Sequence, residues 1–101
     1  MGDTPAGGPR IQLKHPEGKR APSIERDRYE LVRRLVLQTV PAKEPGITWV
    51  DLRTAVDKKL GSKLEGGNNW WYIHGVKLHL EALGDLKRVT ESPQRLVRRG
   101  R

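Results

Sequence analysis

With 101 residues, the chain has room for one domain, and the absence of cysteine excludes disulfides, thiolate catalysis and cysteine-based zinc sites. Its formal net charge of +8 favours a polyanionic partner, although charge alone carries no information about sequence specificity. No apolar run approaches the roughly 20 residues that span a bilayer, and the N-terminus lacks the apolar segment of a signal peptide. We therefore expect a cytoplasmic protein with no part in a membrane.

Residues 1–22 contain four prolines, four glycines and few side chains that a core could bury. This composition predicts a flexible N-terminal arm, with the folded domain beginning at Ser23. Ile11 and Leu13 alternate around Gln12, which is the pattern of a short extended piece. An alternative is therefore that part of the arm docks on the domain.

The first helix is predicted over residues 23–39, with Ser23 as its N-cap. Its apolar side chains share one face with the spacing that a buried helix requires, namely Tyr29, Val32, Leu35, Val36 and Val40. Away from that face lie Arg26, Glu30, Arg33 and Arg34. We interpret these charged residues as the solvated side of an amphipathic helix, which Pro41 and the Pro45-Gly46 pair bring to an end.

A short strand over residues 47–49 leads into a second helix, predicted over residues 50–60. Thr48 precedes this helix and Asp51 follows three residues later, which is the spacing of a capping box. The inward residues are expected to be Leu52, Ala55, Val56 and Leu60, and Gly61 closes the helix. The connection over residues 61–69 is longer than the turn of a strict helix-turn-helix, and its Leu64 is expected to tuck under the domain.

The third helix is predicted to begin after a cap at Asn68 or Asn69 and to stop at Gly84, which suits a left-handed C-terminal position. Its buried face is expected to carry Ile73, Val76, Leu80 and Leu83. Two short strands over residues 86–90 and 94–99 then flank a turn at residues 91–93 that contains a proline. A helix followed at once by a basic hairpin is typical of the second half of a winged helix-turn-helix.

These elements predict an α+β fold with three helices, a short strand and a C-terminal two-stranded hairpin, in the order α-β-α-α-β-β. This is the order of a winged helix-turn-helix, in which the hairpin is the wing. We assign residues 1–22 to the arm, residues 23–99 to the winged-helix domain and residues 100–101 to a C-terminal tail.

Several sequence motifs carry a resemblance to known proteins. The run VKLHLEALGDLKRV resembles the end of a recognition helix entering the wing in many bacterial regulators. The segments GITWVDL, WWYIHGVKLHLEALG and SPQRL together are similar to a small family of uncharacterised bacterial proteins with a winged-helix-like fold, over residues 11–99. The resemblance implies the fold and transfers no functional residue.

An enzyme is not expected, because the sequence lacks the motifs and residue groups that catalysis needs. The histidines are His15, His74 and His79, and the last two are five residues apart, so they point to different faces of a helix and make a poor metal pair. No nucleophile elbow, phosphate-binding loop or dinucleotide-binding motif occurs. We expect no catalytic residue, no metal and no cofactor.

The positive charge is concentrated at the C-terminal end of the chain. Residues 85–101 carry six basic and two acidic side chains, whereas residues 61–84 carry no net charge. The first function we expect is nucleic-acid binding, with DNA as the favoured ligand and transcriptional regulation as the role. The wing is then expected to contact the phosphate backbone through Lys87, Arg88, Arg95, Arg98 and Arg99. Weaker candidates for contacts in the groove are Asn69, His74 and Lys77. The alternative explanation is a solvated basic tail.

The third helix carries a second apolar stripe, formed by Trp71, Leu78 and Ala82, on the side away from the core. Such groups are unusual on a face that reads bases, so we expect the arm, a second copy of the protein or another partner to cover Trp71 and Leu78. The other explanation for an apolar Trp71 at this position is that it wraps the edge of the domain as a large core residue. The stripe favours a second function, a protein-interaction or dimerisation module. A third is an RNA- or ribosome-associated basic domain.

Overall fold

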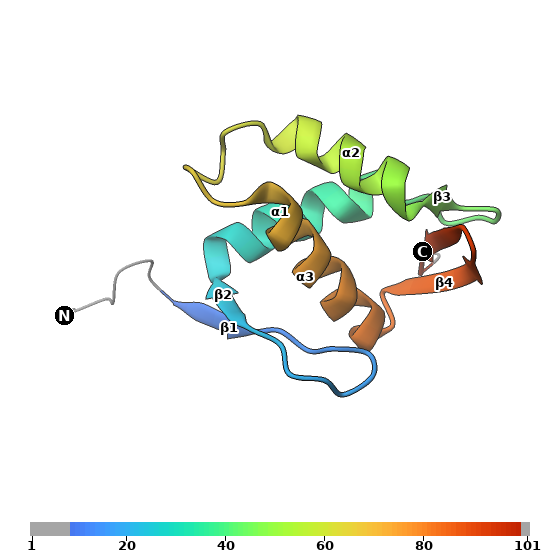
Figure 1. Ribbon diagram of the computed structural model, residues 1–101, viewed down its shortest axis with the longest axis horizontal. Helices are drawn as coiled ribbons and strands as arrows, with labels where there is room; N and C mark the ends of the chain where they lie inside the picture. Colours follow the sequence, from blue (N-terminus) through green and yellow to red (C-terminus); the bar gives the residue numbers. More distant parts are fainter. Residues whose placement is uncertain (1–8, 100–101) are drawn as a thin grey trace.

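The computed structural model describes residues 9–99 of the chain (Figure 1). Three helices pack together with a three-stranded antiparallel sheet whose strand order is β3-β5-β4. A separate two-stranded hairpin precedes the first helix. The elements are β1 (Arg10–Gln12), β2 (Ser23–Glu25), α1 (Arg26–Thr39), β3 (Ile47–Thr48), α2 (Trp49–Leu60), α3 (Asn69–Leu83), β4 (Leu86–Glu91) and β5 (Gln94–Arg98). The predicted α+β winged helix-turn-helix is confirmed, with an N-terminal hairpin added to it.

Helix α1 forms as its apolar spacing requires, with Tyr29, Val32 and Val36 buried. It begins later than predicted, because Ser23 lies in β2 opposite Gln12 and does not cap the helix. Residue Glu25 occupies the N-cap position in an extended conformation and makes no side-chain capping bond. The helix therefore starts where the hairpin ends.

The caps of α2 and α3 are the predicted ones. The Thr48 hydroxyl accepts a hydrogen bond from the Asp51 amide at 3.1 Å, and the Asn68 side chain accepts one from the Trp71 amide at 3.1 Å. Gly84 ends α3 in the left-handed conformation, with φ +86°. The predicted burial of Leu83 is wrong: this side chain is 42% exposed, because Leu80 and Leu86 already fill the core at that end.

The core lies between the three helices and one face of the sheet. Its fully buried members come from every helix and from the wing, including Val32 and Val36 of α1, Leu52 and Val56 of α2, Ile73, Val76 and Leu80 of α3, and Leu96 of β5. Leu64, in the long connection between α2 and α3, is buried as predicted. The connection thus adds to the core although it is too long for a strict helix-turn-helix.

Residues 10–25 form an antiparallel hairpin, β1-β2, whose loop runs alongside α3 (Figure 1). Leu13 is 3% exposed and belongs to the core together with Ile24. The backbone amide of Lys14 donates a hydrogen bond to Nδ1 of His79, on α3, at 2.9 Å. Residues 10–22 are therefore part of the folded unit, which corrects the expectation of a flexible arm for this stretch. The rest of that arm, residues 1–8, and the predicted tail at residues 100–101 lie outside the described residues.

Candidate nucleic-acid interface

Helix α3 is joined to the wing by a cluster of charged side chains that is buried at Lys77 and Glu81. Lys77, on α3, is 2% exposed, and its Nζ lies 2.7 Å from Oε2 of Glu81. Arg88, on β4, places Nη2 2.8 Å from Oε1 of Glu81 and Nη1 3.3 Å from Oε1 of Glu91. The Lys77 Nζ also lies 5.1 Å from the centre of the Trp49 ring. In this arrangement Lys77 and Arg88 both pair with Glu81, which links α3 to β4 of the wing.

Burial lowers the pKa of Lys77 from its ordinary value of 10.5, and the carboxylate of Glu81 opposes that effect. The Lys77–Glu81 ion pair therefore forms in a place where desolvating the charged amine of Lys77 is costly.

The other two residues predicted for groove contacts have different environments. Asn69 donates through Nδ2 to Oδ1 of Asp57 at 2.8 Å and to the carbonyl oxygen of Gly61 at 2.9 Å, so it ties the start of α3 to the end of α2. His74 remains on the outer face of α3, with its ring centre 5.8 Å from that of Trp49. Burial, and then the charge of Lys77, lower the pKa of His74 below its ordinary value, which favours a neutral imidazole at pH 7.

The basic residues of the wing do not gather at its tip. The tip is a tight turn between Glu91 and Gln94, and Arg98 lies opposite Leu86 at the base of the hairpin. Lys87 is exposed on β4 and Arg95 is half-buried on β5. Arg99 is exposed and its Nη2 lies 3.1 Å from Oδ1 of Asp85. The predicted cluster is thus divided between the inward Arg88, the faces of the strands and the base of the wing.

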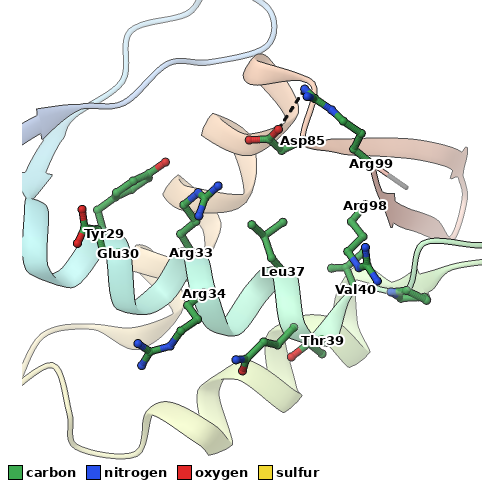
Figure 2. Close-up of a pocket in the computed structure, with 12 residues that line it drawn as sticks. Tyr29, Glu30, Arg33, Arg34, Leu37, Thr39, Val40, Asp85, Arg98 and Arg99 are labelled. Atoms are coloured by element: carbon green, nitrogen blue, oxygen red, sulfur yellow. Dashed lines mark ion pairs between the residues drawn. The ribbon is translucent and has the colours of Figure 1, made fainter. Parts of the chain in front are cut away.

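The base of the wing faces α1 across an open groove of about 1160 Å³. Figure 2 shows Arg33 and Arg34 on α1 and Arg98 and Arg99 on the opposite side, with Leu37 between the two pairs. We call this feature the arginine groove and define it by these four arginines. Among the described residues, its lining contains the two carboxylates of Glu30 and Asp85, fewer than the four arginines. Of the four arginines, only Arg99 makes an ion pair within residues 9–99.

Arg98 and Arg99 are among the predicted wing contacts, whereas Arg33 and Arg34 are predicted to lie on the solvated side of a helix. Adjacent arginines on α1 are a local signal, yet only the folded structure shows that they lie beside the end of β5. The pairing of the Arg98 amide with the Pro41 carbonyl, at 2.9 Å, brings the end of β5 against the end of α1.

Aromatic side chains gather at the starts of α2 and α3. Trp70 and Trp71, at the start of α3, are 50% and 49% exposed. The guanidinium carbon of Arg53, on α2, lies 3.9 Å from the centre of the Trp70 ring and 5.9 Å from that of Trp49. We call the four residues Trp49, Arg53, Trp70 and Trp71 the tryptophan face. This part of α3 offers no free arginine or lysine to base edges.

The loop of the N-terminal hairpin lies beside Trp71 and Leu78, the residues predicted to be covered by the arm, a second copy or another partner. Leu78 is half-buried, and the loop of the hairpin lies over it through residues that include Ala21 and Pro22. Trp71 lines the same pocket as these loop residues and keeps about half of its surface in solvent. The hairpin therefore covers one side of the stripe and leaves the tryptophan face open.

The described part of the chain limits the kinds of site it can hold. Within residues 9–99, no group of three or more histidine, aspartate or glutamate side chains is placed to hold a metal ion. None of the helices in that range is both long and apolar enough to cross a membrane.

Three helices with a sheet ordered β3-β5-β4, ending in a β-hairpin, define a winged-helix protein. The chain belongs to a family of unknown function (DUF6958), which it matches over residues 10–96. The match begins at the first residue of β1, so the N-terminal hairpin is part of the unit that the family shares. No curated protein and no solved structure gives a significant match.

Proposed function

We propose that this protein binds nucleic acid, most simply duplex DNA, by holding the phosphate backbone in the arginine groove, without catalysis. The observation that carries the proposal is the convergence of Arg33 and Arg34, on α1, with Arg98 and Arg99, at the end of β5, on one open groove. A guanidinium group fits a phosphate with two parallel hydrogen bonds, which makes arginine well suited to backbone contacts.

The charge balance of the groove supports this use. Arg33 and Arg34 are exposed, and no carboxylate within residues 9–99 pairs with either of them or with Arg98. The Arg99 side chain is 54% exposed in its ion pair with Asp85. Exposed ion pairs contribute at most about 1 kcal/mol, so a phosphate can compete with Asp85 for this guanidinium.

The same geometry argues against sequence reading by α3. The outward residues of α3 include Trp71, His74 and Leu78, whereas base edges are usually read by arginine, lysine, asparagine or glutamine. Lys77 and Asn69 are occupied in contacts within the protein. We therefore expect similar affinity for duplexes of different sequence, because contacts to phosphates carry no direct sequence information.

Fluorescence anisotropy with a labelled random-sequence duplex, at several salt concentrations from about 50 to 200 mM, tests the proposal. Each phosphate neutralised contributes roughly 0.9 to the slope of log K against log salt, so Arg33→Gln with Arg34→Gln should reduce the slope by roughly 1.8. The matched control is Lys58→Gln with Lys63→Gln, which removes the same charge outside the groove. Equal losses in both double variants would refute a specific role for the groove. A structured RNA bound more tightly at equal salt would identify RNA as the ligand.

A second function, docking of a protein partner or a second copy on the tryptophan face, is favoured by the exposure of that face. Val50, Trp70 and Trp71 are each about half exposed or more, and exposed apolar patches commonly mark interaction sites. Light scattering after size exclusion, over a range of protein concentrations, tests the homodimer. Trp70→Ala should abolish a dimer that uses this face and leave a dimer formed elsewhere unchanged.

A further inference from the structure

A small pocket lies between the loop of the N-terminal hairpin and α3, on the side of α3 away from the core. Its volume is about 120 Å³, and its apolar surface comes from Trp71, Gly75 and Leu78 on the helix and from Ala21 and Pro22 on the loop. A Cβ at Gly75 would lie 3.3 Å from Cδ1 of Leu13, so glycine at this position lets the hairpin pack closely against α3. The pocket is distinct from the arginine groove and shares no residue with it.

The polar part of the lining consists of nitrogen-bearing side chains. Lys14, His15 and Arg20 come from the loop and His74 from α3, and no carboxylate among the described residues lines the pocket. Within residues 9–99, neither Lys14 nor Arg20 forms an ion pair, whereas the neighbouring Lys19 is paired with Glu17 at 3.1 Å. The pocket is thus open to an anionic group from outside.

His15 adds a hydrogen-bond donor to this lining. Its Nδ1 accepts a hydrogen bond from the amide of Glu17 at 3.0 Å. A neutral imidazole carries one proton, so in this hydrogen-bonded form the proton is on Nε2, which can donate. The charge of the pocket and its donors therefore both suit an acceptor such as a carboxylate.

The walls of the pocket are fixed before any ligand arrives. The Leu13 amide donates to the carbonyl of Pro22 at 3.1 Å, the Lys14 amide donates to His79 at 2.9 Å, and the Gly18 amide donates to the carbonyl of His15 at 3.0 Å. A pocket held in this way costs little further ordering when a ligand binds.

We propose that this pocket binds a small apolar carboxylate, with its hydrocarbon part against Trp71 and Leu78 and its carboxylate beside Lys14 and Arg20. The size limits the hydrocarbon part to one ring or a short branched chain, since an apolar protein cavity of about 150 Å³ holds a benzene molecule. The proposal is independent of nucleic-acid binding, because it uses different residues.

The test is a titration of the full-length protein, labelled with ¹⁵N, with sodium benzoate at constant ionic strength, followed by NMR. We expect saturable shifts of the Trp71 indole N–H and of the Gly75 amide at millimolar benzoate. Two matched probes separate the two halves of the ligand: benzyl alcohol has the ring without the charge, and acetate has the charge without the ring. Each should bind at least tenfold more weakly than benzoate.

Variants identify the residues that contribute. Lys14→Gln with Arg20→Gln should weaken benzoate binding about tenfold, and Lys19→Gln, in the same loop but outside the pocket, should leave it unchanged. All three positions are exposed, so the variants are expected to fold, which circular dichroism checks. Equal binding of benzyl alcohol and benzoate, the absence of saturable shifts, or shifts centred on the arginine groove would each overturn the proposal.

Discussion

The buried charge cluster predicts that two substitutions in one ion pair have very different effects. Glu81→Gln leaves Lys77 buried without an anionic partner, and removing one member of a buried pair costs about 3–5 kcal/mol. The side chains of Lys77 and Glu81 are 3% and 8% exposed, so solvent screens this pair weakly. Lys77→Met leaves Glu81 paired with Arg88 at 2.8 Å and removes the cost of burying an amine. That variant should lie within about 1 kcal/mol of the wild type, because apolar replacements of buried ions are often near neutral.

Urea unfolding followed by tryptophan fluorescence measures both effects. For a small domain with a slope of about 2 kcal/mol per molar urea, Glu81→Gln should lower the midpoint by roughly 2 M. Lys77→Met should shift it by less than about 0.5 M. Similar urea midpoints for the two variants would refute the expected difference between them. They would also refute the view that the desolvation cost of the cluster falls on Lys77.

The pH dependence gives an independent check. The folded-state pKa of Lys77 is lowered by burial, so between that pKa and 10.5 the unfolded state binds more protons and stability rises with pH. Burial also raises the pKa of Tyr29, which makes stability fall above pH 10, so the wild type must be compared with Lys77→Met. Lys77→Met should lack the rise in stability below pH 10.5. An identical dependence of stability on pH in the two proteins would contradict the assignment of that rise to Lys77.

Three further predictions concern the hairpin and the end of α3. Leu13→Ala should cost about 2–5 kcal/mol of unfolding free energy by thermal or urea melts, because the side chain is fully in the core; a loss under 0.5 kcal/mol would mean an undocked hairpin. Burial lowers the pKa of His79, so as the pH drops below the unfolded value of 6.5 the unfolded state takes up the proton first and stability decreases. Protonation of Nδ1 also removes the acceptor for the Lys14 amide, so the protection factor of that amide against hydrogen exchange should fall as His79 becomes protonated at low pH; an unchanged protection factor contradicts this. Gly84→Ala should cost about 1 kcal/mol by urea melts, since φ is +86° and no clash is present; an unchanged midpoint would contradict it.

Local signals in the sequence identified most of the winged-helix frame. Thr48, Asn68 and Gly84 act within three residues of their own position, as caps and as a left-handed terminus, so their roles follow from the adjacent sequence. The apolar spacing of α1 and the turn of the wing are local in the same way.

The N-terminal hairpin depends on contacts between residues far apart in the chain. Leu13 and Ile24 are separated by a loop rich in polar residues, proline and glycine, and the amide of Lys14 meets His79, 65 residues further on. A three-residue strand carries too little alternation to be distinguished from coil, so the composition of residues 1–22 suggested an arm.

The candidate site could be predicted only in part from the sequence, because it too depends on contacts between distant residues. Lys77 and Glu81 have the spacing of an ion pair along a helix, but their burial depends on Trp49 and Arg88, which other elements supply. The arginine groove needs α1 to lie beside the end of β5, a contact between the two halves of the chain. Sequence periodicity describes one element at a time and does not contain this information.

The most direct test of the proposed function is a ¹⁵N NMR titration of the protein with a short random-sequence DNA duplex at low salt. If the groove holds the phosphate backbone, the largest shifts should fall on Arg33, Arg34, Arg98 and Arg99, with small shifts at Trp71 and His74. Shifts centred on the start of α3 would contradict phosphate binding in the arginine groove and would favour contacts between that helix and the bases. An unchanged spectrum at millimolar DNA would remove nucleic acid as the ligand and favour a protein partner on the tryptophan face.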